Sequence, residues 1–240
     1  ASKASFLRQQ SRVEFEGNVT VHRAADVIHS DKAFAQLDQN QKQLVALEGS
    51  GKVRAVISNA PTGPGGASGG NKTITADNFT TEFTPDGKIR ALNVNGGPAL
   101  AEAVLDGPPP RTVTAKTFRA TFDQSRISEL KAVGGMKMVE PARTLTSDSG
   151  TVYFSLTTHE ASSVVVDGNV HFVDPKLSGT SDRVNYNFST GAIVLTAIPG
   201  GQPVVTTDGQ TRKGDMIAAQ LNEGVVHVTK NVSARIMPKS

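Results

Sequence analysis

A repeated strand pattern constrains the fold of this chain more than any single motif. In six segments a polar residue is followed by apolar or small residues two, four and six positions later. Residues two apart in a strand point to the same sheet face, so each segment predicts one half-buried β-strand. The segments are DKAFAQL from Asp31, DNFTTEF from Asp77, KTFRATF from Lys116, DSGTVYF from Asp148, DRVNYNF from Asp182 and DMIAAQL from Asp215.

The spacing of these segments indicates a true repeat. Their first residues are 46, 39, 32, 34 and 33 residues apart. The longest interval contains the tract SNAPTGPGGASGGN, residues 58–71, whose 14 residues account for the excess. A period of about 33 residues is typical of a supersecondary unit that stacks on copies of itself and so buries a face it could not bury alone. We therefore expect about six stacked repeats of roughly 33 residues.

The residues between the strands predict hairpins that bend. Turn-forming residues follow each alternation, as in TPDGK from Thr84. In the return strand, Ile89, Leu92 and Val94 precede Gly96, and this change of spacing from three to two favours a bulge or corner. A third short strand is predicted after the glycine in several units, as in GNVHFV from Gly168.

These patterns predict an all-β fold, a long and open-ended sandwich of two facing sheets. We expect a single domain over residues 13–236, with an insertion at 58–71 and a flexible segment at 1–12, because the repeats are continuous through the 240 residues. Helix is scarce. Residues 98–105 are a weak helix candidate, and residues 24–37 contain the strand alternation and are interpreted as strand.

Composition excludes several classes of function. The chain has no cysteine, which rules out disulfides, thiolate metal sites and cysteine nucleophiles. Its net charge is +3 and the basic residues are scattered, so nucleic-acid binding is not predicted. No stretch of eighteen apolar residues occurs. We predict no enzymatic activity, no cofactor and no metal site.

Several short strings resemble the OstA-like family. They are EGNVTV from Glu16, DGNVHF from Asp167 and the return strand that ends in glycine. The family comprises periplasmic lipopolysaccharide-transport proteins of the bridge and anchor type and the amino-terminal domain of their outer-membrane partner. The resemblance extends from about Val13 to Ile236. It implies an elongated, slightly twisted β-jellyroll that is open along one side and shields lipid acyl chains in its apolar interior. It also implies a periplasmic location, with an export signal or membrane anchor before Ala1, and end-to-end docking.

The strand alternation also nominates the residues that would line such a groove. Burial of acyl surface contributes about 25 cal/mol per Å², so an open sandwich with an apolar inner face favours lipid entry. The alternative is that the same side chains fill a closed core, as most inward apolar residues do. The candidates are Phe79, Phe83, Phe118, Phe122, Val152, Phe154, Val184, Tyr186, Phe188, Ile217 and Leu221.

The two ends of a stacked sheet provide candidate docking edges. An unpaired strand edge can accept another chain by backbone hydrogen bonding, and contact between unlike edges extends head to tail. Loops or charges that block the edges are the alternative. The candidate edge residues are Phe15, Val19, Val21, Val226, Val228 and Val232.

Other motifs carry weaker signals. Residues 66–70 match G-x-S-x-G, but no helix pattern follows, so a loop is predicted rather than a nucleophile. His159-Glu160 begins like a zinc motif, but Ser163 stands where the second histidine would be. The aspartates that recur at the start of the pattern are interpreted as structural turn or strand-start residues rather than as a calcium ladder.

The leading hypothesis is therefore a non-enzymatic periplasmic lipopolysaccharide-transport protein. Its expected partners are lipopolysaccharide or a related lipid, and other jellyroll proteins or copies of itself joined head to tail. The alternative is an extracellular carbohydrate-binding or adhesive β-solenoid, which would show parallel strand pairing throughout.

Overall fold

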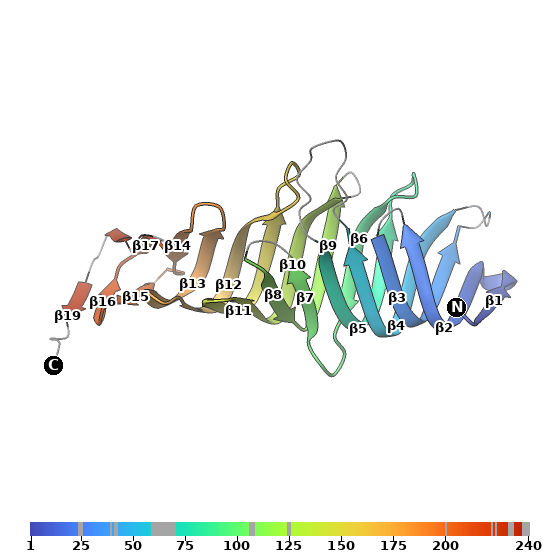
Figure 1. Ribbon diagram of the computed structural model, residues 1–240, viewed down its shortest axis with the longest axis horizontal. Coiled ribbons are helices and arrows are strands. Elements are labelled where there is room, and N and C mark those ends of the chain that lie inside the picture. Colours follow the sequence, from blue (N-terminus) through green and yellow to red (C-terminus); the bar gives the residue numbers. More distant parts are fainter. Residues whose placement is uncertain are drawn as a thin grey trace.

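The protein is an elongated body of β-strands that runs from β1 at one end to β19 at the other (Figure 1). The computed structural model describes residues 1–23, 26–38, 40, 43–58, 71–105, 109–123, 126–199, 201–221, 223, 225–229 and 233–236. Within these ranges the only helical element is one 3-10 turn, so the predicted all-β class is confirmed. None of the described helical structure is long and apolar enough to cross a membrane.

The first half of the chain contains β1 (Lys3–Leu7), η1 (Arg8–Gln10), β2 (Arg12–Arg23), β3 (Asp26–Leu37), β4 (Leu44–Ile57), β5 (Lys72–Phe83), β6 (Ile89–Asn95), β7 (Ala101–Leu105), β8 (Arg111–Ala115) and β9 (Thr117–Asp123). The second half contains β10 (Arg126–Glu140), β11 (Arg143–Phe154), β12 (Ala161–Val173), β13 (Leu177–Asn187), β14 (Ala192–Thr196), β15 (Val204–Thr207), β16 (Gln210–Lys213), β17 (Met216–Gln220), β18 (Val225–Thr229) and β19 (Ser233–Ile236).

Every strand pairing in the described ranges is antiparallel, and neighbours in space are mostly neighbours in sequence. Some long strands pair with two short ones. β5 pairs with β6 and β7, β10 with β9 and β8, and β13 with β14 and β15. This pairing contradicts the parallel-coil alternative.

The long strands bend at a glycine near their middle. Register shifts occur in β2, β4, β10 and β12. The skipped pairs are Gly17-Asn18, Gly51-Lys52, Gly134-Gly135 and Gly168-Asn169, and all eight residues have positive φ. This conformation favours Gly and Asn, and a bulge bends its strand. The predicted bulge is confirmed in β6, where the register shifts between Ile89 and Ala91, but the corners of the long strands lie at these four pairs and not at Gly96. The segments after the corner glycines are second halves of long strands rather than separate third strands.

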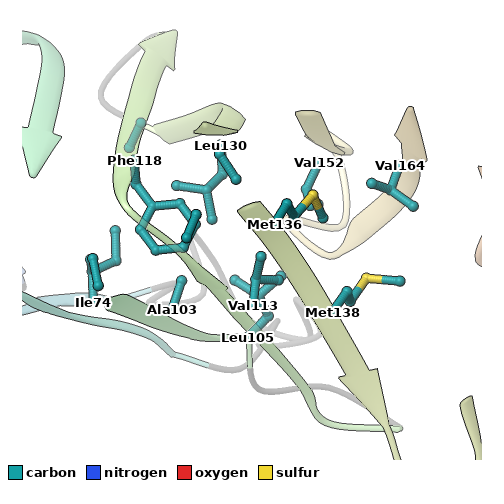
Figure 2. Packing of buried hydrophobic residues seen from close by; sticks show 14 of the residues in the cluster. Ile74, Ala103, Leu105, Val113, Phe118, Leu130, Met136, Met138, Val152 and Val164 are labelled. Atoms are coloured by element: carbon teal, nitrogen blue, oxygen red, sulfur yellow. The ribbon is translucent and has the colours of Figure 1, made fainter. Parts of the chain in front are cut away.

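Bending creates a continuous apolar core between the two halves of the strands. Figure 2 shows side chains from several strands meeting there, among them Ile74, Val113, Phe118 and Met136. Each of these four is at most 1% exposed. The core cluster extends from Val19 in β2 to Leu221 after β17. Burial of this interior is the dominant stabilising term for the fold.

The hairpin turns fall on two rims, which we call rim A and rim B. Rim A contains the strand ends at Ile57, Lys72, Leu105, Arg111, Glu140, Arg143, Val173 and Leu177. Rim B contains those at Phe83, Ile89, Asp123, Arg126, Phe154, Ala161, Asn187 and Ala192. Because the strands bend between the rims, the rims face each other opposite the glycine corners. We call the line where they meet the mouth.

Two local predictions are corrected by the structure. Residues 3–7, expected within a flexible segment, form β1, which pairs with β2 from Lys3↔Glu16 to Leu7↔Arg12. The alternating side chains of this segment supply a strand that covers half of β2. The weak helix candidate at 98–105 instead contains strand β7, which pairs with β5 and β8 and buries Ala101, Ala103 and Leu105. Residues 59–70, including the G-x-S-x-G string, lie outside the described ranges.

Candidate functional site

The candidate lining residues all point toward the interior. Eight of them are buried: Phe79, Phe118, Val152, Phe154, Val184, Tyr186, Ile217 and Leu221. Three are partly buried and pack against the same core: Phe83, Phe122 and Phe188. They belong to β5, β9, β11, β13 and β17 or to the turns that follow, so they form a row along the body. The structure brings the row together as one apolar interior.

Side chains fill this interior beneath the mouth. One cavity there has a volume of about 20 Å³ and is lined by Met138, Leu145, Phe172, Ile193 and Leu221, with Arg143, Asp174 and Tyr186 nearest the mouth. About 10–15 Å³ of this kind of space holds one water molecule. An acyl chain would therefore have to displace side chains or separate the rims to occupy this part of the interior.

Rim A carries a row of buried charged residues that sequence reasoning missed. Lys72, Arg111, Glu140 and Asp174 are 2%, 7%, 4% and 8% exposed. A buried charge is costly unless it is paired and hydrogen-bonded. The four residues are 39, 29 and 34 residues apart, close to the strand repeat. That spacing is the sequence signal that could have revealed them.

An ion-pair chain runs along rim A. Arg111 Nε donates to Glu140 Oε1 at 2.7 Å, and Arg143 Nε donates to Asp174 Oδ2 at 2.6 Å. Arg143 Nη1 lies 3.5 Å from the other Glu140 oxygen, so Glu140 joins the two arginines. Positive and negative groups alternate along the chain, which offsets the desolvation of each.

Lys72 and Arg111 of rim A contact aromatic and backbone groups of rim B across the mouth. Lys72 Nζ donates to the His159 carbonyl at 2.9 Å and lies 5.2 Å from the centre of the Phe154 ring. The Arg111 guanidinium lies 4.1 Å from the centre of the Phe188 ring. These are cation–π distances.

Arg143 supplies a third contact across the mouth. Its Nη1 donates to Tyr186 Oη at 2.9 Å. The Tyr186 ring meets Phe188 edge-on, with 5.0 Å between ring centres. Burial, together with the nearby Glu140 carboxylate, raises the pKa of Tyr186, so the hydroxyl stays protonated. Rim A cations and rim B rings therefore close the mouth between Lys72 and Phe188.

His159 lies in the rim B turn between β11 and β12, where it contacts another side chain of the fold. Its φ is +61°, and its Nε2 lies 2.6 Å from Arg126 Nη1. Burial and the Arg126 charge lower the pKa of His159, which favours the neutral ring as acceptor of the Arg126 hydrogen bond. No group of three or more His, Asp or Glu side chains within the described ranges is arranged to hold a metal ion.

Three of the five recurring aspartates pack against positive-φ glycines in separate parts of the fold, so they do not form one site. A Cβ added to Gly51, Gly97 or Gly168 would come within 2.6, 2.2 or 2.3 Å of a carboxylate oxygen of Asp31, Asp77 or Asp148, respectively. Each aspartate therefore packs against a positive-φ glycine on a nearby segment. Most of these residues are within strands rather than at strand starts, whereas Asp215 directly precedes β17.

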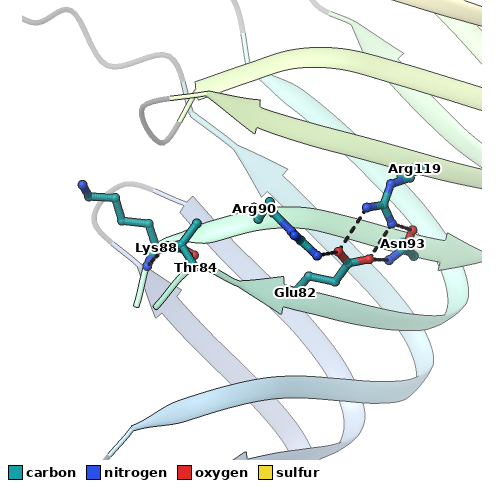
Figure 3. Close-up of polar contacts among 6 residues, drawn as sticks. All are labelled: Glu82, Thr84, Lys88, Arg90, Asn93 and Arg119. Atoms are coloured by element: carbon teal, nitrogen blue, oxygen red, sulfur yellow. Dashed lines mark hydrogen bonds and ion pairs between the residues drawn. The ribbon is translucent and has the colours of Figure 1, made fainter. Parts of the chain in front are cut away.

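The outer face of β5, β6, β9 and β10 contains a shallow groove of about 440 Å³. It is lined by Asn78, Phe79, Thr80, Asn93, Val94, Asn95, Thr117, Phe118, Arg119, Lys131 and Val133. Figure 3 shows Glu82 beside it, held by Arg119, Arg90 and Asn93. Hydrogen bonds from Arg119 and Arg90 lower the pKa of Glu82 to about 2. The network links three adjacent strands.

The candidate docking edges are partly where the sequence predicted them. The second half of β2, with Val19 and Val21, pairs only with β3 among the described strands, and β18, with Val226 and Val228, pairs only with β17. Phe15 differs from the prediction: it pairs with Ala33 on one side and Ala4 on the other, because β1 covers this half of β2. Val232 lies outside the described residues.

Comparisons with known proteins match parts of the chain. Residues 1–69 match the family "LptA/(LptD N-terminal domain) LPS transport protein". One solved structure that matches is LptH of Pseudomonas aeruginosa, the LptA homologous periplasmic component of the conserved lipopolysaccharide transport device. The two share 15% identity with a TM-score of 0.47, and the match covers 55% of this chain and 97% of LptH. No curated protein matches the sequence. The resemblance drawn from the strand motifs is thereby confirmed over residues 1–69 as one to the LptA and LptD amino-terminal family of lipopolysaccharide-transport proteins.

Proposed function

We propose that this protein is a non-enzymatic lipopolysaccharide-transport protein of the periplasm that shields acyl chains within its interior. The family match over residues 1–69 supports the substrate class and the compartment. The antiparallel all-β body supports the extension of this function to the remaining strands, because they continue the same bent architecture.

The observation that carries the proposal is the continuous apolar core from Val19 to Leu221. It extends along the body rather than forming one compact centre. Each methylene that leaves water contributes about 0.8 kcal/mol, so an acyl chain laid along such an interior would be strongly favoured once inside. The headgroup would remain outside the mouth, beyond the buried charges of rim A.

The strand edges at the two ends support a second part of the proposal, head-to-tail docking with other jellyroll proteins or copies of this chain. β1 and β18 each pair on one side only among the described strands. They also present exposed apolar side chains, with Phe6 48%, Leu7 37% and Val225 39% exposed. Backbone pairing between unlike ends would extend one apolar interior into the next.

Site-specific photocrosslinking in cells tests lipid binding directly. A photoreactive residue at Phe122 or Tyr186, both of which face the interior, should capture lipopolysaccharide. The matched control is Tyr153, the other tyrosine of the chain, which is 37% exposed on the outer face. Capture at the interior positions but not at Tyr153 supports the proposal, and folded protein without interior capture would overturn it.

A further inference from the structure

We propose that the contacts between the rims form a latch that holds the mouth shut and must release before an acyl chain enters. The latch consists of Lys72, Arg111 and Arg143 on rim A, and of His159, Tyr186 and the rings of Phe154 and Phe188 on rim B. The role in lipid entry rests on the proposed function, whereas the opening of the mouth is a property of the protein alone.

The packed interior makes such a release necessary. The cavity beneath Arg143 and Tyr186 holds about 20 Å³. A water-sized space does not admit a hydrocarbon chain. Entry along the mouth therefore requires the two rims to move apart.

The fold allows the rims to separate without loss of the strand ladders. Ladder hydrogen bonds join strands that are neighbours along the body, such as β10 with β11 and β11 with β12. The contacts of the latch instead run from a rim A side chain to a rim B group. The glycine corners, at Gly134-Gly135 and Gly168-Asn169 in these strands, lie on the side opposite the mouth and are the natural hinge.

The arginines of rim A make two kinds of contact: ion pairs along rim A, and contacts across the mouth to rim B. Glu140 and Asp174 bind their arginines along rim A, so these buried pairs can stay intact when the rims part. Opening breaks the hydrogen bonds from Lys72 to His159 and from Arg143 to Tyr186, the cation–ring contacts and the apolar packing beneath them. Glu140 and Asp174 are thus positioning residues that hold Arg111 and Arg143 against rim B.

The test variant is the double substitution Lys72→Met and Tyr186→Phe. Methionine keeps an unbranched stem but removes the ammonium group that binds the His159 carbonyl. Phenylalanine removes only the hydroxyl that accepts from Arg143, and Arg143 keeps Asp174 and Glu140. The control is Lys131→Met with Tyr153→Phe, which changes the same residue types at exposed positions of β10 and β11.

Opening can be measured by cysteine labelling, because the natural chain contains no cysteine. One cysteine replaces Met138, which lies beneath the mouth and is 2% exposed, and in a separate protein one replaces Ala132, which is 1% exposed near the corner of the same strand. In the latch variant, a soluble thiol reagent should label Met138→Cys about tenfold faster, with little change at Ala132→Cys, because only the local opening is favoured. The control variant should label both sites at the original rates.

Each result has a distinct meaning. An unchanged rate at Met138→Cys, or an equal rise at both cysteines, would overturn the latch, since the latter indicates global unfolding. A urea titration of each variant confirms that the folded state persists. Because no lipid is present in this experiment, loss of interior photocrosslinking with normal latch behaviour would refute the proposed function and leave the latch intact.

Discussion

Asp148 and Gly168 pack against each other where β11 and β12 turn the corner of the fold. Gly168 has φ +80°, and a Cβ on it would come 2.3 Å from Asp148 Oδ2. The same oxygen accepts a hydrogen bond from Asn169 Nδ2 at 2.8 Å. The aspartate that begins the sequence repeat and the glycine about twenty residues later are thus two parts of one structural corner.

Gly168→Ala should destabilise the protein by about 1–3 kcal/mol, because it combines an unfavourable left-handed conformation with a clash against Asp148. The free energy of unfolding from urea titration measures this loss. Gly135→Ala is the matched control: Gly135 has φ +79° but no atom within 4 Å of the added Cβ. It should lose less stability than Gly168→Ala, and equal losses would show that the packing against Asp148 has no role.

The faces of the strands could be predicted from the sequence because side-chain direction has a strict period of two. Phe79, Phe118 and Val184 each stand in an alternating segment, and each is at most 1% exposed. The corner at Gly168 was also predictable, because a glycine between two strand-like runs favours a positive φ. These features depend on local geometry, which a sequence pattern reports directly.

The mouth could not be predicted in the same way. Lys72 and His159 are 87 residues apart, and their contact depends on how far the stacked strands twist and tilt between the rims. Strand periodicity carries no information on that offset. Likewise, the pattern predicts an edge at Phe15, because nothing in it shows that residues 3–7 fold back to cover this part of β2.

Phe118→Ala should lower the free energy of unfolding by about 3–5 kcal/mol, because Phe118 is fully enclosed by the core. Val133→Ala in the adjacent strand is the control: Val133 is 44% exposed and should change stability by no more than about 0.5 kcal/mol. A loss below about 1 kcal/mol for Phe118→Ala would indicate that the ring lies against open space rather than packed side chains.

Glu82→Gln should destabilise the protein modestly, by up to about 1 kcal/mol at neutral pH, because it weakens the hydrogen bonds to Arg119 and Arg90 on a partly exposed surface. The folded state lowers the pKa of Glu82 from 4.5 to about 2. The ionised Glu82 carboxylate therefore makes its full contribution to the free energy of unfolding above pH 4.5. This contribution is lost as the pH falls toward 2 and the carboxylate is protonated in the folded state. Urea titrations across this range should show the difference between wild type and variant shrink, whereas Glu102→Gln, an exposed substitution on β7, should have little effect at any pH.

Removal of residues 225–240 should weaken end-to-end assembly while most of the body stays folded, because stability in a stacked fold depends mainly on nearest neighbours. The deletion removes β18 and β19, which form the carboxyl-terminal edge next to β17 and β16. Light scattering at matched protein concentrations measures the change as a lower average mass. A shorter deletion of residues 237–240 keeps both strands and should assemble like the full chain. Unchanged mass after the longer deletion would exclude this edge from assembly, whereas circular dichroism of both deletions separates a lost contact from a lost fold.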